Sequence, residues 1–216
     1  MAERPAREKG RAAEELPRQM RADARRNRDK LVEAAARVFA EQGGVDASLE
    51  DIARRAGVGI GTLYRHFPTR EHLVEVVYRR EVEALSRAAD ALAAANPPDV
   101  ALNEWMLRLV DYAATKRGMA NSLRVLQDTN AALFADTAGL VSATLRRLLE
   151  AAAAAGTVRS DVDSADVFRA ISGIFSAPGT PDWRERSRRL VSLIMDGLRW
   201  SAPGGEGGGG KGPRVT

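Results

Sequence analysis

The chain has 216 residues, of which 44% are apolar and 5% aromatic, and it contains no cysteine. This length allows one large domain or two small ones, and the lack of cysteine excludes a disulfide framework and a thiolate metal site. The formal net charge is +4, and all of the excess lies in residues 1–80, which hold 17 Lys and Arg against 13 Asp and Glu. This asymmetry favours a polyanionic partner for the N-terminal part.

Composition also argues against several other functions. The two histidines, His66 and His72, cannot form a zinc site without carboxylates, and no nucleophile–base–acid set is recognisable, so we predict neither a metal, a cofactor nor an enzyme. No apolar run reaches the roughly 18–20 residues that cross a bilayer, and the charged N-terminus lacks an apolar signal segment. We therefore expect a cytoplasmic protein that does not contact membranes.

Residues 1–22 are charged, contain Pro5, Gly10 and Pro17, and show no apolar periodicity. We predict a disordered arm over this range. Arginines gather where the arm meets the first predicted helix; they are Arg18, Arg21, Arg25, Arg26 and Arg28. They form either a solvated charge run or part of an arm that lies along DNA.

Four helices are predicted in the N-terminal part. The first runs from Arg25 to Gln42 and carries one apolar stripe, formed by Leu31, Ala34, Ala35, Val38 and Phe39. Ser48 precedes a short helix over 49–56, with Asp51 near the position of a capping-box acid. A second short helix follows over 59–66, and Thr69 caps a long helix that reaches about Ala95.

The run Asn96-Pro97-Pro98 marks a boundary. Beyond it the pattern is again helical: one helix ends at a kink near Arg117-Gly118, a second continues through Leu126, and a third runs over about 131–155. Asp163 caps the next helix, which contains Phe168 and Phe175, and the last runs over about 181–200. No segment is predicted as a strand, and the glycine-rich residues 201–216 are predicted to be disordered.

The stretch "GVGIGTLYRHF", residues 57–67, spaces its glycines as G-x-G-x-G. A dinucleotide fingerprint needs G-x-G-x-x-G between a strand and a helix, and a P-loop needs G-x-x-x-x-G-K-[ST], so neither fits. A helix-turn-helix does fit, because Ala53 allows two helices to cross closely and Gly57 allows a turn with positive φ. Val58 and Leu63 would then bury one face of the second helix against Ile52.

A longer segment strengthens this interpretation. The sequence "LVEAAARVFAEQGGVDASLEDIARRAGVGIGTLYRHFPTREHL", from Leu31 to Leu73, resembles the DNA-binding domain of the TetR family of transcriptional regulators. The resemblance implies an all-α fold, with a three-helix helix-turn-helix domain over 23–84 (the motif itself at about 49–67) and a helical ligand-binding and dimerisation domain over 85–200. It implies a homodimer.

We expect the DNA contacts to come from the first part of this domain. By resemblance, Thr62, Tyr64, His66 and Arg70 face DNA, mostly phosphates, although Tyr64 and His66 could instead pack against the first helix. Ser48 could contact a phosphate as well as cap its helix. Gly59 and Gly61 either allow close approach to the groove or only loosen the helix start. Arg65 is the candidate base reader, and Ile60 offers an apolar surface to thymine.

The effector site is less defined by the sequence. Candidate pocket residues, each of which could equally be plain core, are Trp105, Met106, Tyr112, Met119, Phe134, Phe168 and Phe175. The helices over about 138–155 and 183–198 are the candidates for the dimer interface. We therefore expect a repressor that binds a pseudo-palindromic operator on double-stranded DNA and is released by a small, partly apolar effector. An activator of the same architecture and a nonspecific DNA-organising protein are the alternatives.

Overall fold

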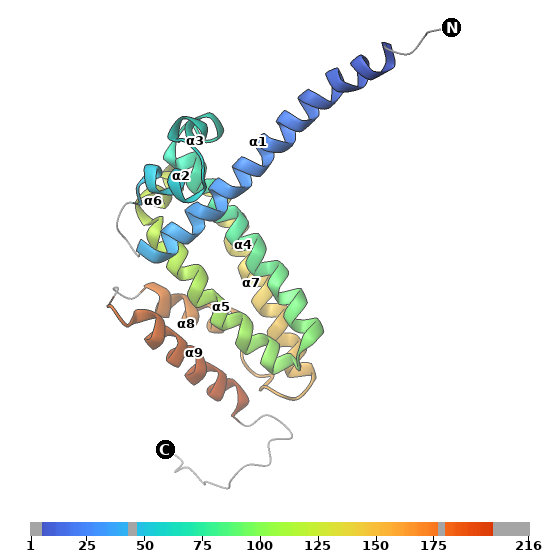
Figure 1. Ribbon diagram of the computed structural model, residues 1–216. Helices are drawn as coiled ribbons and strands as arrows, with labels where there is room; N and C mark the ends of the chain where they lie inside the picture. Colours follow the sequence, from blue (N-terminus) through green and yellow to red (C-terminus); the bar gives the residue numbers. More distant parts are fainter. Residues whose placement is uncertain (1–5, 43–46, 177–179, 201–216) are drawn as a thin grey trace, which may run out of the picture. The chain divides into compact units, whose positions relative to one another are not determined.

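The computed structural model describes residues 6–42, 47–176 and 180–200, and within them it contains helices and no strand. The predicted all-α fold is confirmed. The predicted disorder of the tail over 201–216 lies outside the described residues. The helices, drawn in Figure 1, are α1 (Ala6–Gln42), α2 (Leu49–Arg55), α3 (Ile60–His66), α4 (Arg70–Ala95), α5 (Pro98–Gly118), α6 (Ala120–Thr129), α7 (Ala131–Ala154), α8 (Ser164–Ser176) and α9 (Trp183–Arg199).

The chain divides into two compact units. Unit 1 comprises Met1–Arg80 and Ala114–Asn130, and unit 2 comprises Glu81–Ala113 and Ala131–Thr216. We predicted a single boundary at residue 84, because the recognisable motif is contiguous in sequence. The structure instead adds α6 and the end of α5 to unit 1.

Helix α1 begins at Ala6, whereas we predicted an arm over 1–22 and a helix from Arg25. The segment "AREKGRAAEEL" that opens α1 is rich in Ala, Arg and Glu, which have high intrinsic helix propensity. Extending a helix from an already formed one also avoids the cost of nucleation. Apolar periodicity could not reveal this half of α1, because most side chains over 20–30 are exposed and bury no stripe.

The predicted helix-turn-helix is present in unit 1. Helix α2 is capped by Ser48, whose Oγ accepts a hydrogen bond from the Asp51 backbone N–H at 3.3 Å. The helix ends in a Schellman motif, in which Gly57 N–H donates to the Arg54 carbonyl at 3.1 Å and Val58 N–H donates to the Ala53 carbonyl at 3.0 Å. This motif needs Gly57 in the left-handed region, and its φ is +70°.

The core of unit 1 holds the helix-turn-helix against α1 and the start of α4. Its fully buried large side chains include Leu31, Phe39, Ile52, Leu63, Phe67 and Leu73. The end of α5 also approaches α1: a Cβ built on Gly118 would lie 2.0 Å from the Phe39 carbonyl oxygen. Only a glycine allows these two backbones to approach so closely.

Unit 2 is a helical layer around buried aliphatic side chains. Trp105 of α5 is fully buried, and its indole N–H donates to the Leu85 carbonyl of α4 at 2.9 Å. The Asp163 carboxylate caps α8 by accepting from the Ala165 N–H at 2.8 Å, as predicted. Gly156, with φ +70°, ends α7. Within this unit, α8 and α9 lie side by side (Figure 1).

Candidate nucleic-acid interface

Helix α3 presents one face that the rest of unit 1 leaves uncovered. Ile60 and Tyr64 are 36% and 46% exposed although both are large and largely apolar. Gly61 and Arg65, the residues that directly follow Ile60 and Tyr64, are also four positions apart and are exposed as well. On the opposite side Leu63 is fully buried. Helix α3 is therefore anchored by Leu63 and offers the face of Ile60, Gly61, Tyr64 and Arg65 to a partner.

The glycines of this face have no packing role within the protein. A Cβ placed on Gly59 or on Gly61 would meet no atom within 4 Å. Gly61 lies inside α3, where glycine costs about 1 kcal/mol relative to alanine. Packing within the protein does not require a glycine at this position. The absence of a side chain on the exposed face of α3 therefore needs another explanation.

Arginines around the helix-turn-helix fall into two groups. Those of α2 are neutralised: Arg54 pairs with Asp51, and Arg55 pairs with Asp51 at 2.9 Å and with Glu41 at 2.5 Å. The hydrogen bond that Arg55 donates to the Glu41 carboxylate raises the pKa of Arg55 above its usual value. Arg65, by contrast, forms no ion pair within the described part of the chain. Its positive charge remains available to an anionic partner.

Ser48 is exposed at the start of α2. Its hydroxyl donates to the Glu50 carboxylate at 2.7 Å, and this hydrogen bond lowers the pKa of Glu50. The cap role of Ser48 is confirmed by its bond from Asp51. A phosphate contact by Ser48 remains a prediction, and it would have to compete with the Glu50 carboxylate.

Phe67 closes the C-terminal end of α3 and gathers three side chains around its buried ring. His66 and His72 contact it with ring centroids 6.4 Å and 5.6 Å away. The Arg28 guanidinium of α1 lies 5.3 Å from the Phe67 centroid, in the range of a cation–π contact. His66 and Thr62 are half-buried. The contact between Arg28 and Phe67 had no signal in the sequence, because it joins residues far apart in the chain.

Arg70 is held by the protein itself. Its Nε donates to Ser122 Oγ of α6 at 3.2 Å, its Nη1 donates to the Ala47 carbonyl, and its guanidinium lies 5.8 Å from the Phe39 ring centroid. The side chain thus connects α4, α6 and the segment before α2. Our expected phosphate contact by Arg70 stays a prediction, and the structure adds this positioning role.

The candidate pocket residues lie in different surroundings. Trp105 and Met106 are fully buried in unit 2, whereas Tyr112, Phe134 and Phe168 are half-buried there. Met119 is buried in unit 1, and the side chain of Phe175 lies outside the described residues. The hydrogen bond of Trp105 to Leu85 indicates a packing role for that side chain.

The described residues contain no group of three or more His, Cys, Asp or Glu side chains that could hold a metal ion. None of their helices combines the length and the apolar character needed to cross a bilayer.

Family models match two segments of the chain. Residues 31–77 match the model described as bacterial regulatory proteins of the tetR family. Residues 97–200 match the model described as the C-terminal domain of SbtR-like transcriptional regulators. The first segment contains α2, α3 and the surface described above.

Solved structures resemble most of the chain. A TetR transcriptional regulator from Streptomyces coelicolor is 49% identical, with a TM-score of 0.71 over 80% of this chain and 98% of its own. A TetR transcription regulatory protein from Mycobacterium vanbaalenii is 38% identical, with a TM-score of 0.64 over 83% and 99%. LfrR from Mycobacterium smegmatis, solved in complex with proflavine, is 20% identical with a TM-score of 0.55 over 81% and 94%, a likeness of fold alone.

Curated relatives match a shorter part. An HTH-type transcriptional regulator from Staphylococcus aureus is 41% identical over 64 residues, which is 30% of this chain and 35% of that protein. The match thus spans about a third of the length of such relatives.

Proposed function

The chain belongs to the TetR family of DNA-binding transcriptional regulators, and we propose that it is a cytoplasmic, homodimeric repressor that a small molecule releases from a pseudo-palindromic operator. The observation that carries this proposal is the exposed face of α3. It combines two glycines without a packing role, two exposed apolar side chains and an arginine without an ion pair in the described part of the chain. Such a face suits insertion into a major groove.

The recognition step follows from this face. Gly59 and Gly61 let the α3 backbone approach the groove floor, and Arg65 then reaches guanine N7 and O6 with two N–H donors. Ile60 contacts a thymine methyl group, while Tyr64, Thr62 and His66 contact phosphates and fix the register. A dimer would place its two α3 helices about 34 Å apart, one turn of B-DNA.

Selection of bound duplexes from a random pool tests the function. We expect an enriched palindromic motif with a guanine in each half-site. Arg65→Ala should cost about 1–3 kcal/mol on this motif and relax the preference at the guanine position. Arg54→Ala, which removes an arginine already paired with Asp51, should leave the preference intact. A pool without any enriched motif would indicate the nonspecific DNA-organising alternative, and unchanged discrimination by Arg65→Ala would remove Arg65 as the reader.

Effector release is supported by the complex of LfrR with proflavine, a property of that protein. By linkage, a ligand that binds more tightly to the conformation with poorly spaced α3 helices weakens DNA binding by the same factor. The half-buried aromatic side chains of unit 2, Tyr112, Phe134 and Phe168, are the candidates for the contact with an apolar effector. Trp105, Met106, Met119 and Phe175 remain weaker candidates.

The dimer interface is proposed on α7 and α9. Leu190 and Leu193 of α9 are 42% and 66% exposed, Trp200 just beyond it is 70% exposed, and Leu140 of α7 is 38% exposed. Leu190 and Leu193 share one face of α9 by their spacing, and Trp200 follows the end of the helix. An exposed apolar row of this kind favours association with a second copy.

Replacing the most exposed leucine of this row tests the interface. Leu193→Glu should convert the dimer into monomers, because each interface would bury an unpaired carboxylate. Light scattering on the full chain measures the mass. Val125→Glu, at a 51% exposed position of α6, is the matched control and should stay dimeric. A dimer formed by Leu193→Glu would place the interface elsewhere.

A further inference from the structure

The N-terminal half of α1 carries a row of arginines at helical spacing. In the sequence these are Arg7, Arg11, Arg18, Arg21, Arg25 and Arg28. At about 100° per residue they fall within about 100° of the helix circumference. Glu14 and Asp29 share this face by the same count. We call Arg21, Arg25 and Arg28, whose side chains the structure describes, the arginine stripe.

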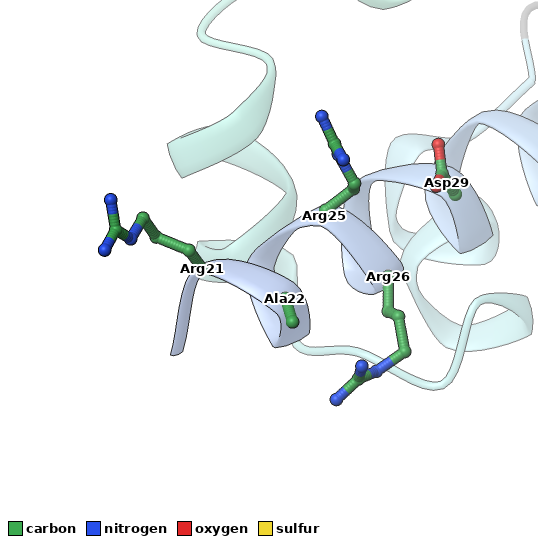
Figure 2. A pocket seen from close by; sticks show the side chains of 5 residues that line it. All are labelled: Arg21, Ala22, Arg25, Arg26 and Asp29. Carbon is green, nitrogen blue, oxygen red and sulfur yellow. The ribbon is translucent and has the colours of Figure 1, made fainter. Parts of the chain in front are cut away.

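Arg25 differs from the ion-paired arginines of α1. Arg26 pairs with Asp23, and Arg37 pairs with Glu33 at 2.6 Å. Arg25 is exposed and forms no ion pair within the described residues. Figure 2 shows that Arg25 and Arg26 leave α1 in opposite directions. Asp29, one of the two acidic residues on this face, pairs with Arg80 of α4 at 3.8 Å.

The surface around the stripe is hollowed and uncovered by packing. A pocket of about 500 Å³ is lined by Arg21, Ala22, Arg25, Arg26 and Asp29 (Figure 2). Three of these side chains are cations and one is an anion. The first fully buried side chain of α1 among the described residues is Leu31. None of the side chains over 20–30 is buried, so packing in the core does not explain this part of α1.

The stripe also leads to the recognition helix. Arg28, its last member, stacks on Phe67 at the end of α3 with 5.3 Å to the ring centroid. In unit 1, the N-terminal half of α1 extends past α2 and α3 (Figure 1). From Ala6 to Arg28, at about 1.5 Å per residue, this part of α1 spans about 33 Å. That is close to the roughly 34 Å of one turn of B-DNA.

From these observations we propose that the arginine stripe is a second DNA-binding surface, which binds the phosphate backbone flanking each operator half-site. The stripe supplies charge and donors at regular spacing and carries no base reader, so it extends the footprint without adding sequence information. This inference rests on the proposed operator binding by α3, because the flank is defined relative to the half-site.

The experiment compares two duplexes and two double variants. One duplex ends at the edges of the selected operator, and the other extends it by one helical turn on each side. The stripe variant is Arg21→Gln/Arg25→Gln. The control variant is Arg37→Gln/Arg79→Gln, which removes the same charge from unit 1 at ion-paired positions that do not line this pocket. Hydroxyl-radical footprinting and binding titrations over a range of salt are the measurements, with circular dichroism to verify helix content.

We expect the wild type to protect about ten base pairs beyond each half-site on the long duplex. The stripe variant should lose this protection, bind the long duplex about tenfold more weakly, and show a salt slope smaller by about 1.8 per bound chain. On the short duplex the stripe variant and the wild type should bind equally, and the control should behave as wild type on both.

Several results would overturn the inference. One is an unchanged footprint in the stripe variant, and another is an equal loss of DNA affinity in the control variant. A third is a stripe variant that binds both duplexes like the wild type but loses binding to anionic phosphatidylglycerol vesicles, which would assign the stripe to a membrane surface. A wild type that binds neither duplex specifically would instead refute the proposed function. The two failures are therefore distinguishable.

Discussion

Gly61→Glu should abolish operator binding while leaving the fold intact. A side chain at position 61 meets no protein atom within 4 Å at its Cβ, so unit 1 accommodates it. Replacing a glycine inside a helix should even stabilise α3, by up to about 1 kcal/mol when the new residue is alanine. On DNA, however, the same side chain would hold the backbone away from the groove and bring a carboxylate next to phosphates.

Like-charge contacts at an interface cost several kcal/mol, so we expect an affinity loss of at least about 100-fold on the selected operator. The measurements are fluorescence anisotropy for binding and thermal unfolding for stability. Gly61→Ala serves as the graded variant and should lose less affinity, because it adds one methyl group and no charge. Gly173→Ala in α8, at a position that is equally open and lies outside the proposed dimer interface, should leave DNA binding unchanged. Tight binding by Gly61→Glu would show that this face does not meet DNA.

Local signals in the sequence predicted the helix-turn-helix well. The caps at Ser48, Thr69 and Asp163 and the left-handed turn at Gly57 depend on residue types within four positions of one another. Such features are readable without knowledge of tertiary structure. The same holds for the burial of Leu63, which follows from spacing on a helix.

The features that sequence reasoning missed are tertiary. The donors of Arg70 reach Ala47 and Ser122, and Ser122 is 52 positions away in the chain. Nothing near Arg70 in the sequence indicates which acceptors the fold will bring to it. Similarly, the first half of α1 has no apolar stripe, so periodicity could not distinguish a polar helix from an arm.

The contacts of Arg70 and Gly118 together indicate how the helix-turn-helix is positioned in unit 1. Arg70 connects the start of α4 to α6 through Ser122, and Gly118 brings the end of α5 against the α1 backbone at Phe39. Both contacts lie within unit 1 and join the segment 114–130 to the helices that carry α3. The orientation of α3 therefore depends on a segment that is distant in sequence from the DNA-binding motif.

Gly118→Ala should consequently destabilise unit 1 and impair DNA binding as a result. The new Cβ would lie 2.0 Å from the Phe39 carbonyl oxygen and 2.6 Å from the carbonyl carbon. These are backbone atoms, which cannot rotate away as a side chain does, so α1 and α5 must separate. Overpacking typically costs about 1–3 kcal/mol and occasionally more. Because the clashing atoms belong to the backbone, we expect a net destabilisation of about 3 kcal/mol here, after the roughly 1 kcal/mol that alanine gains in helix propensity.

For a chain of this size, 3 kcal/mol corresponds to a melting temperature about 6–12 °C lower. Calorimetry or circular dichroism measures this shift, and Gly173→Ala in α8, whose added methyl group meets no atom within 4 Å, should not lower the melting temperature. Measuring binding and thermal unfolding together also separates two causes of lost binding. Gly61→Glu should lose binding without a lower melting temperature, whereas Gly118→Ala should lose both together. If Gly118→Ala melted like the wild type, the close approach of α5 to α1 would not be a constraint on unit 1, and the orientation of α3 would have to be fixed by Arg70 and the buried core alone.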